Sequence, residues 1–104
     1  MSETMAKRGL PRVHPGELLA DDLRELGLSA NAFADEIGVP PNRVYQIIKK
    51  QRAITADTAL RLATFFGASA EFWMNLQTNY DLWVTERSRG RAIRKRVRPL
   101  KRAA

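Results

Sequence analysis

Cysteine is absent from this chain of 104 residues, and histidine occurs only once, at His14. The lack of cysteine excludes disulfide bonds, thiolate metal sites and a cysteine nucleophile. His14 has no second ligand at metal-binding spacing, so we expect it on the surface or at a helix start. No nucleophile is paired with a base, and no glycine-rich phosphate loop is present. The sequence therefore predicts no enzymatic activity, no cofactor and no metal ion.

Long apolar runs are also missing from the sequence. The first 16 residues contain no apolar stretch of the kind found in signal peptides. No segment approaches the ~20 apolar residues that a membrane span requires. Hydrophobic residues make up 44% of the chain, which is enough for one compact domain with a modest core. We therefore expect a soluble, cytoplasmic protein without a membrane partner.

Acidic residues are missing from one end of the chain. Residues 1–86 hold 9 Lys and Arg against 11 Asp and Glu, whereas residues 87–104 hold 9 basic residues and no acidic residue. These two parts, −2 and +9, sum to the net charge of +7. Such an excess of positive charge favours a polyanionic partner. The chain thus combines a near-neutral body with a strongly basic tail.

The clearest pattern lies in residues 29–50, SANAFADEIGVPPNRVYQIIKK. Small and apolar residues recur there at helical spacing around a single glycine, Gly38, which suits a turn with an unusual backbone shape. This spacing predicts two short helices that cross around a tight turn, a helix-turn-helix. The residues expected to share its core are Phe33, Ala34, Ile37, Val39, Val44 and Ile47.

Three further helices are predicted by apolar periodicity together with start and stop signals. The first runs from Pro15 to Gly27, and two more follow the helix-turn-helix, over about residues 56–66 and 70–84. The sequence therefore predicts an all-α, five-helix bundle over residues 14–86, with a flexible lead-in at 1–13 and a basic, disordered tail at 87–104.

Polar and basic side chains in and beside the motif are expected to bind DNA, most of them on the outer face of its second helix. Those expected to reach base edges are Pro41, Asn42, Arg43 and Gln46. Those expected to contact phosphates are Ser29, Asn31, Lys49, Lys50 and Arg52. Ser29 could cap its helix, contact a phosphate or do both, and capping alone is the preferred interpretation. For the others the alternative is an ordinary, solvated helix face without a partner.

Aromatic residues are concentrated in the fifth helix. A single helix-turn-helix reads few base pairs, so a symmetric pair is expected, and part of this run is a candidate dimer interface rather than core. The interface residues proposed on this basis are Trp73, Leu76, Tyr80 and Trp83. The alternative is that the whole run belongs to the core of one protomer.

Three segments give a more specific indication: HPGELL, then LSANAFADEIGVPPNRVYQII, then ITADTALRLATFFGASAEFWMNLQTNYDL. Together they closely resemble the HigA-type antitoxins, which belong to the lambda-repressor-like helix-turn-helix superfamily. The resemblance covers about residues 13–84. It implies a dimeric protein that blocks a RelE-like, RNA-cleaving toxin and represses its own operon at a palindromic operator. Such toxins are generally basic, so the acidic face of the first helix is a candidate toxin contact, formed by Glu17, Asp21, Asp22 and Glu25.

Two positions depart from the family pattern. Ala30 stands where a glutamine is usual, and Lys50 stands where a glycine usually closes the recognition helix. Two other functions stay open: a regulator of the same fold without a toxin, and a protein-interaction module that only keeps the helix-turn-helix shape. The basic tail either contacts DNA phosphates, which is preferred, or becomes ordered on a protein partner.

Overall fold

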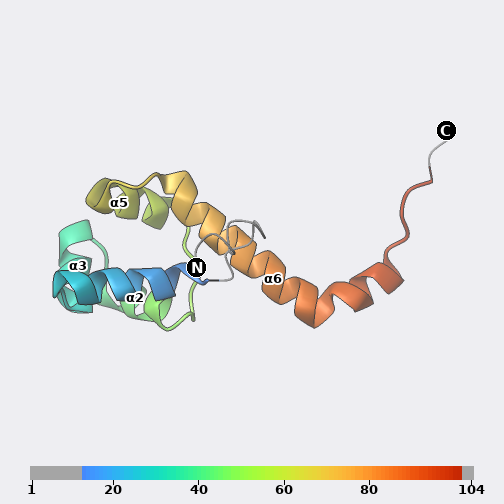
Figure 1. Cartoon of the computed structure of the whole chain (residues 1–104), viewed down its shortest axis with the longest axis horizontal. Coiled ribbons are helices and arrows are strands. Elements are labelled where there is room, and N and C mark those ends of the chain that lie inside the picture. Colours follow the sequence, from blue (N-terminus) through green and yellow to red (C-terminus); the bar gives the residue numbers. More distant parts are fainter. Residues whose placement is uncertain (1–12, 102–104) are drawn as a thin grey trace.

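The computed structural model describes residues 13–101, and its helices are all α-helices (Figure 1). They are α2 (Pro15–Leu26), α3 (Ala30–Ile37), α4 (Pro41–Ile48), α5 (Ala56–Phe66) and α6 (Ala70–Arg96). Residues 13–101 contain no strand, so the predicted all-α fold with five helices is confirmed. The predicted flexible lead-in lies outside the described residues, apart from Val13.

Local sequence signals set the helix ends. The side chains of Ser29, Thr55 and Ser69 each accept a hydrogen bond from a backbone N–H in the first turn of α3, α5 and α6. These contacts satisfy N–H groups that have no partner inside the helix. Gly38 ends α3 with φ 73°, a left-handed conformation that lets the chain turn directly into α4.

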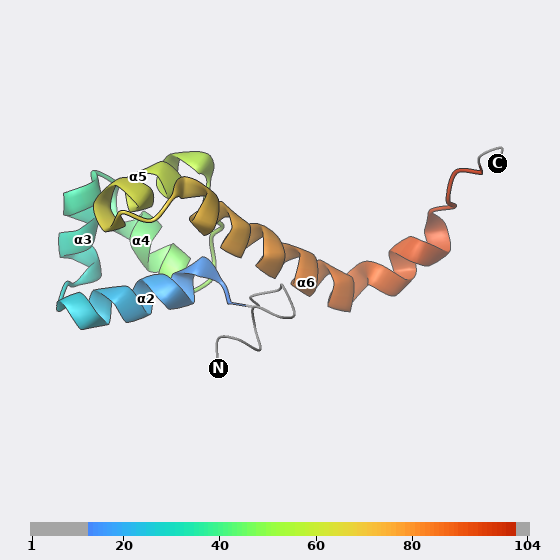
Figure 2. The same cartoon turned by 45° about the horizontal axis from the view of Figure 1, so that its top comes forward.

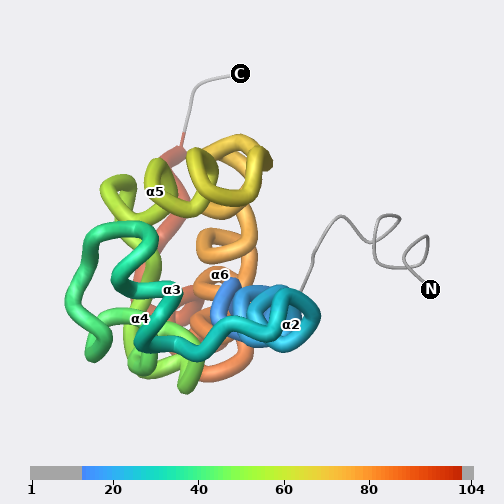
Figure 3. The backbone as a smooth tube through the Cα atoms, turned by 90° about the vertical axis from the view of Figure 1, so that its left-hand side faces the viewer, coloured from blue at the N-terminus to red at the C-terminus, as the bar shows by residue number. Residues whose placement is uncertain are grey.

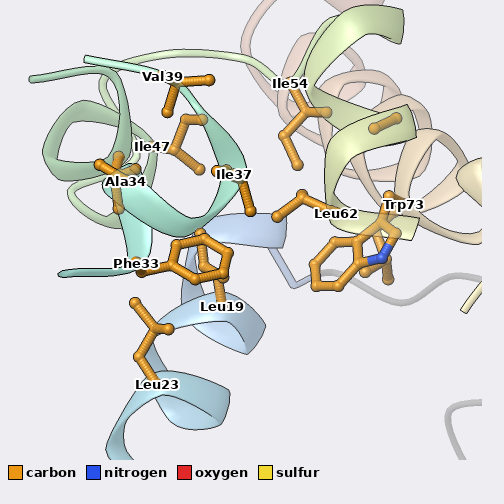
Figure 4. Packing of buried hydrophobic residues seen from close by; sticks show 13 residues of the cluster. Leu19, Leu23, Phe33, Ala34, Ile37, Val39, Ile47, Ile54, Leu62 and Trp73 are labelled. Carbon is orange, nitrogen blue, oxygen red and sulfur yellow. The ribbon is translucent and has the colours of Figure 1, made fainter. Parts of the chain in front are cut away.

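The helix-turn-helix is built around a shared apolar core (Figure 4). Phe33 and Ala34 of α3 are fully buried, and Val44 and Ile47 of α4 are almost fully buried. The prediction for this core is confirmed. The core continues into the other helices through Leu19, Leu23, Ile54, Ala59, Leu62, Trp73 and Leu76. Figure 3 looks along the molecule from the α3 side and shows α2 to α5 in front, with α6 leading away behind them.

The start of α2 packs very closely against the end of α4. A Cβ atom added to Gly16 would lie 1.9 Å from the carbonyl oxygen of Ile47, so only glycine fits there. His14 caps α2, because its Nδ1 accepts a hydrogen bond from the backbone N–H of Gly16 at 2.8 Å. His14 is buried and packs edge-on against Tyr80, with ring centroids 4.9 Å apart. Of the two expected places, a surface position or a helix start, the structure confirms the helix start.

Helix α6 begins in the core and ends in solvent (Figures 1 and 2). Near its start Gln77 is buried and its side-chain oxygen accepts a hydrogen bond from the backbone N–H of Ile54 at 2.8 Å. This contact ties the connection between α4 and α5 to α6. The second half of the helix projects away from the other four helices, and the helix bends midway along its length (Figure 1).

The predicted disorder after residue 86 is wrong for residues 87–96, which are helical. Arg and Lys are good helix formers, and three of them lie in the last turn, where they favour the negative end of the helix dipole. Glu86 also binds the guanidinium of Arg94 through both carboxylate oxygens, at 3.1 and 2.5 Å, across Gly90. The Ser88 hydroxyl donates to the Val84 carbonyl at 2.9 Å, a contact that commonly bends helices. We call residues 87–101 the basic arm.

Within residues 13–101, no helix is long and apolar enough to cross a membrane.

Candidate nucleic-acid interface

Helix α4 presents a polar face to solvent. Val44 and Ile47 anchor it to the core and thereby fix which side chains point outward. Pro40 precedes the helix and Pro41 occupies its first turn, so α4 starts without a side-chain cap. The outward side chains are Pro41, Asn42, Arg43, Tyr45, Gln46 and Lys49, of which Arg43 and Gln46 are partly buried and the others exposed. A helix with free backbone at its start and polar side chains along one face suits insertion into the major groove.

Arg43 does not extend freely into solvent. Its Nη1 atom donates to Oδ2 of Asp57, at the start of α5, at 3.2 Å. The same oxygen accepts a hydrogen bond from Nε of Arg61 at 2.9 Å. The hydrogen bond from Arg61, followed by the contact with Arg43, holds the pKa of the Asp57 carboxyl below its usual value. The side chain of Arg43 is 30% exposed.

Two of the predicted phosphate-binding residues lie at the start of α3. Ser29 is the N-cap, and its hydroxyl oxygen accepts a hydrogen bond from the Ala32 backbone N–H at 3.0 Å. The capping role is thus confirmed, and the phosphate contact stays a prediction. Asn31 is exposed in the first turn.

The other predicted phosphate contacts follow α4. Lys49, Lys50 and Arg52 are all exposed in the connection to α5. Lys50 has φ 62°, the only positive φ among the described residues other than glycine. The backbone at this position therefore has the shape that glycine adopts most easily, as the family pattern implied. The Lys50 ammonium lies 3.4 Å from the Glu17 carboxylate, so the end of α4 is linked to the start of α2.

Comparison with known proteins places this geometry in a family. Residues 19–73 match the model of a helix-turn-helix family. The chain is 47% identical over 90 residues to virulence-associated protein I of Dichelobacter nodosus, covering 86% of this chain and 83% of that protein. It is 38% identical over 89 residues to antitoxin HigA-1 of Vibrio cholerae, covering 85% and 83% of the two chains.

The chain belongs to the HigA-type antitoxin family. Solved structures agree with this assignment. A HigA-family addiction module antidote protein from Coxiella burnetii is 48% identical with a TM-score of 0.81, covering 88% of this chain and all of that one. HigA of Pseudomonas aeruginosa, solved with the higBA promoter, is 40% identical with a TM-score of 0.81, at the same coverage.

Two of the expected dimer residues of this HigA-type chain lie in the core of the single protomer. Trp73 is 1% exposed and Leu76 is 7% exposed. Trp73 packs against Phe66 of α5, with ring centroids 5.8 Å apart. Their assignment to a dimer interface is therefore wrong, because their surface is already covered by the same chain. Tyr80 and Trp83 are partly exposed, and the guanidinium of Arg87 lies 5.2 Å from the Trp83 ring centroid.

The acidic face of α2 is present as a surface. Glu17, Asp21 and Glu25 are exposed, and Asp22 is partly buried. Burial, with the negative charges of Glu25 and Asp21, raises the pKa of Asp22. Asp21 also forms an ion pair with Arg24. Glu17 lies beside the end of α4, because its carboxylate contacts the ammonium of Lys50.

Two residues at the interface were missing from the sequence prediction. Tyr45 is 42% exposed and follows Asn42 by three residues and precedes Lys49 by four, a spacing that puts all three on one face of α4. That spacing was sufficient to identify it. Asp57 carried no such signal, because its contact with Arg43 joins residues 14 positions apart and depends on how α5 packs.

Proposed function

We propose that this protein is an antitoxin that neutralises a RelE-like, mRNA-cleaving toxin and, as a homodimer, represses its own operon by binding a palindromic operator. The observation that carries the DNA-binding part is the exposed polar face of α4, which the buried side chains of Val44 and Ile47 hold outward. The Pseudomonas aeruginosa antitoxin HigA was solved with the higBA promoter. Because the present chain is similar to it over nearly its whole length, that structure supports promoter binding by the present chain as well.

In this proposal α4 enters the major groove and its start meets the bases. Asn42, Arg43 and Gln46 form hydrogen bonds to base edges, while Pro41 and Tyr45 make apolar contacts there. Ser29 and Asn31 bind phosphates on one side of the groove, and Lys49, Lys50 and Arg52 bind them on the other. Phosphate contacts position the protein, whereas base contacts select the sequence.

The proposed dimer brings two α4 helices to the two halves of a palindrome. Tyr80 and Trp83 are aromatic side chains of α6 that the protomer leaves partly exposed, and their ring centroids lie 6.3 Å apart. A pair of partly exposed aromatic rings where α6 leaves the body supports an interface between two copies. Light scattering at micromolar concentration measures the mass directly, and a monomer mass would contradict the dimer.

The proposed toxin contact is the acidic face of α2, at Glu17, Asp21, Asp22 and Glu25. Residues 13–86 hold 6 Lys and Arg against 10 Asp and Glu, so the body offers an acidic surface to a basic, RNA-handling toxin. The basic arm repels such a partner and favours DNA phosphates instead.

One pair of experiments tests the proposal. Fluorescence anisotropy compares binding to the DNA upstream of the protein's own gene with binding to a shuffled duplex of the same composition, at several salt concentrations. Tight binding to the upstream DNA alone is expected, and equal affinity for both duplexes would contradict operator recognition. Co-purification with the product of the adjacent small reading frame tests the toxin. Operator binding without such a product would favour a regulator of the same fold that has no toxin.

A further inference from the structure

A chain of three charged side chains connects the end of α3 to α4 through α5. Nη1 of Arg61 donates to the carbonyl oxygens of Ile37 and Gly38, at 2.8 and 3.3 Å. Its Nε donates to Asp57, and Asp57 in turn accepts a hydrogen bond from Arg43. Arg61 is therefore held by backbone carbonyls at the turn of the motif. The carboxylate of Asp57 contacts both Arg61 and Arg43, so it links the position of Arg43 to that of Arg61.

The atoms used in this chain leave one edge of Arg43 free for recognition. The contact with Asp57 is made by Nη1. The Nε and Nη2 atoms form the other edge of the planar guanidinium, with parallel N–H bonds that match O6 and N7 of guanine. An arginine held in this way loses less side-chain entropy on binding than one that is free to rotate.

The negative charge of Asp57 also favours base reading by Arg43 over phosphate binding. Arg43, Arg52 and Arg61 line a polar hollow of about 370 Å³ together with Asp57. Without the carboxylate, three guanidinium groups beside the start of α5 would attract a phosphate of any sequence. With it, part of that positive charge is neutralised, and a phosphate placed there would face a negative group.

We propose that Asp57 is a positioning residue that determines specificity, because it directs Arg43 to read guanine and disfavours its use as a phosphate contact. This inference depends on the DNA binding proposed above. Arg43 and Asp57 are 30% and 58% exposed, so their ion pair lies at the surface; what sets it apart is that Arg61, the second partner of Asp57, is fixed to backbone carbonyls.

The test compares two charge-removing variants of the full-length protein. Asp57→Asn keeps the shape of the side chain and removes its charge. Glu71→Gln is the matched control, since Glu71 is the first-turn acid of α6 as Asp57 is of α5. The probes are duplexes selected by the unaltered protein from a random pool, the same duplexes with each guanine replaced in turn, and a shuffled duplex. Selection also checks the proposed function itself, because a protein that does not recognise an operator selects no sequence.

For Asp57→Asn we expect affinity for the shuffled duplex to rise and preference for one guanine in each half-site to fall by about tenfold. Glu71→Gln should leave that preference unchanged. In an Arg43→Ala background, Asp57→Asn should have no further effect on the preference at that guanine, because the residue through which it acts is missing. The melting temperature is measured for each variant.

Two results would overturn the inference while leaving operator binding intact. One is an equal gain in affinity for selected and shuffled duplexes, which would mean that Asp57 acts only through net charge. The other is that Asp57→Asn lowers the guanine preference by the same factor in the Arg43→Ala background as in the unaltered protein. That result would mean that Asp57 acts on the fold and not through Arg43. Failure of the unaltered protein to select any sequence would instead contradict the proposed function.

Discussion

The body of this protein and its basic arm are parts of one chain, and helix α6 belongs to both. In the body, α6 buries Trp73 and Leu76 against the other helices. In the arm, residues 91–101 are all exposed, and Ile93 and Val97 are 40% and 60% exposed. The body holds an excess of acidic residues, whereas residues 87–101 hold 8 basic residues and no acidic residue.

The comparison separates two sources of helical structure. The first half of α6 is stabilised by tertiary packing, which supplies most of the stability of helices in proteins. The second half depends on local terms, namely the ion pair between Glu86 and Arg94 and the basic residues near the helix end. Local terms of this kind are individually small. The arm should therefore respond to partners and salt, while the body should respond to changes in packing.

The largest expected contrast is between the two tryptophans of α6. Trp73→Ala removes a fully buried ring and should lower the free energy of unfolding by about 3–5 kcal/mol. Trp83→Ala should change the stability of the protomer much less and instead weaken the dimer. Thermal unfolding and light scattering of both variants measure these effects. If Trp83→Ala left the dimer unchanged, the interface would have to lie on another surface of the protein.

The next contrast is between two glycines. Gly16→Ala places a Cβ against the backbone of Ile47 and should destabilise the protein by about 3 kcal/mol, because neither helix can give way without a shift. At Gly90 the added Cβ meets only the ends of the Glu86 and Arg94 side chains, which can move. Gly90→Ala should stabilise the helical conformation of the arm by up to about 1 kcal/mol, because alanine has a higher helix propensity than glycine. Urea unfolding measures the stability of both variants, and circular dichroism measures their helicity. A similar loss of stability in both variants would contradict the distinction between a packed body and a loosely held arm.

A third contrast concerns DNA. Arg43→Ala should cost about 1–3 kcal/mol in operator binding and relax the sequence preference, because a base contact is lost. Deletion of residues 91–104 should leave the preference intact and flatten the salt dependence, because phosphate contacts are lost. Anisotropy titrations at three salt concentrations measure both quantities. An unchanged slope after the deletion would mean that the arm does not contact DNA.

A smaller effect is expected at the end of α4. Lys50→Gly relieves a positive φ and should stabilise the protein by about 1 kcal/mol, while the loss of the cation weakens DNA binding. Lys49→Gly is the control, since Lys49 carries the same charge at φ −83° and gains nothing from glycine. If both variants were equally stable, strain at Lys50 would be of no consequence.

The smallest effect on stability is expected from His14, which caps α2 and packs against Tyr80 of α6. Burial is the main reason that the pKa of His14 lies below 6.5 in the folded protein. The unfolded chain therefore binds more protons just below pH 6.5, and stability should fall as the pH drops from 6.5 to the lowered pKa. His14→Asn keeps a capping side chain that does not titrate, and should remove this pH dependence. Urea unfolding between pH 7 and 5 measures it, and the same pH dependence in both proteins would assign it to other groups.

The sequence by itself determined the features that depend on near neighbours in the chain. Helix positions, the caps at Ser29 and Thr55 and the turn at Gly38 follow from periodicity and side-chain chemistry over a few residues. The polar face of α4 follows in the same way, because the spacing of Val44 and Ile47 fixes which residues point outward. The division of charge between body and arm needs only a count.

Only the tertiary structure decided what each apolar or charged side chain meets. An apolar stripe shows that a helix face is covered, but not whether its own chain or a second copy covers it, which is why Trp73 and Leu76 were misassigned. The helical arm was missed because Gly90 and the dense positive charge weaken the local signal, while Glu86 and Arg94 stabilise it across two turns. The contact of Arg43 with Asp57 depends on where α5 lies relative to α4, and that placement is set by the packing of both helices in the whole core rather than by any local segment.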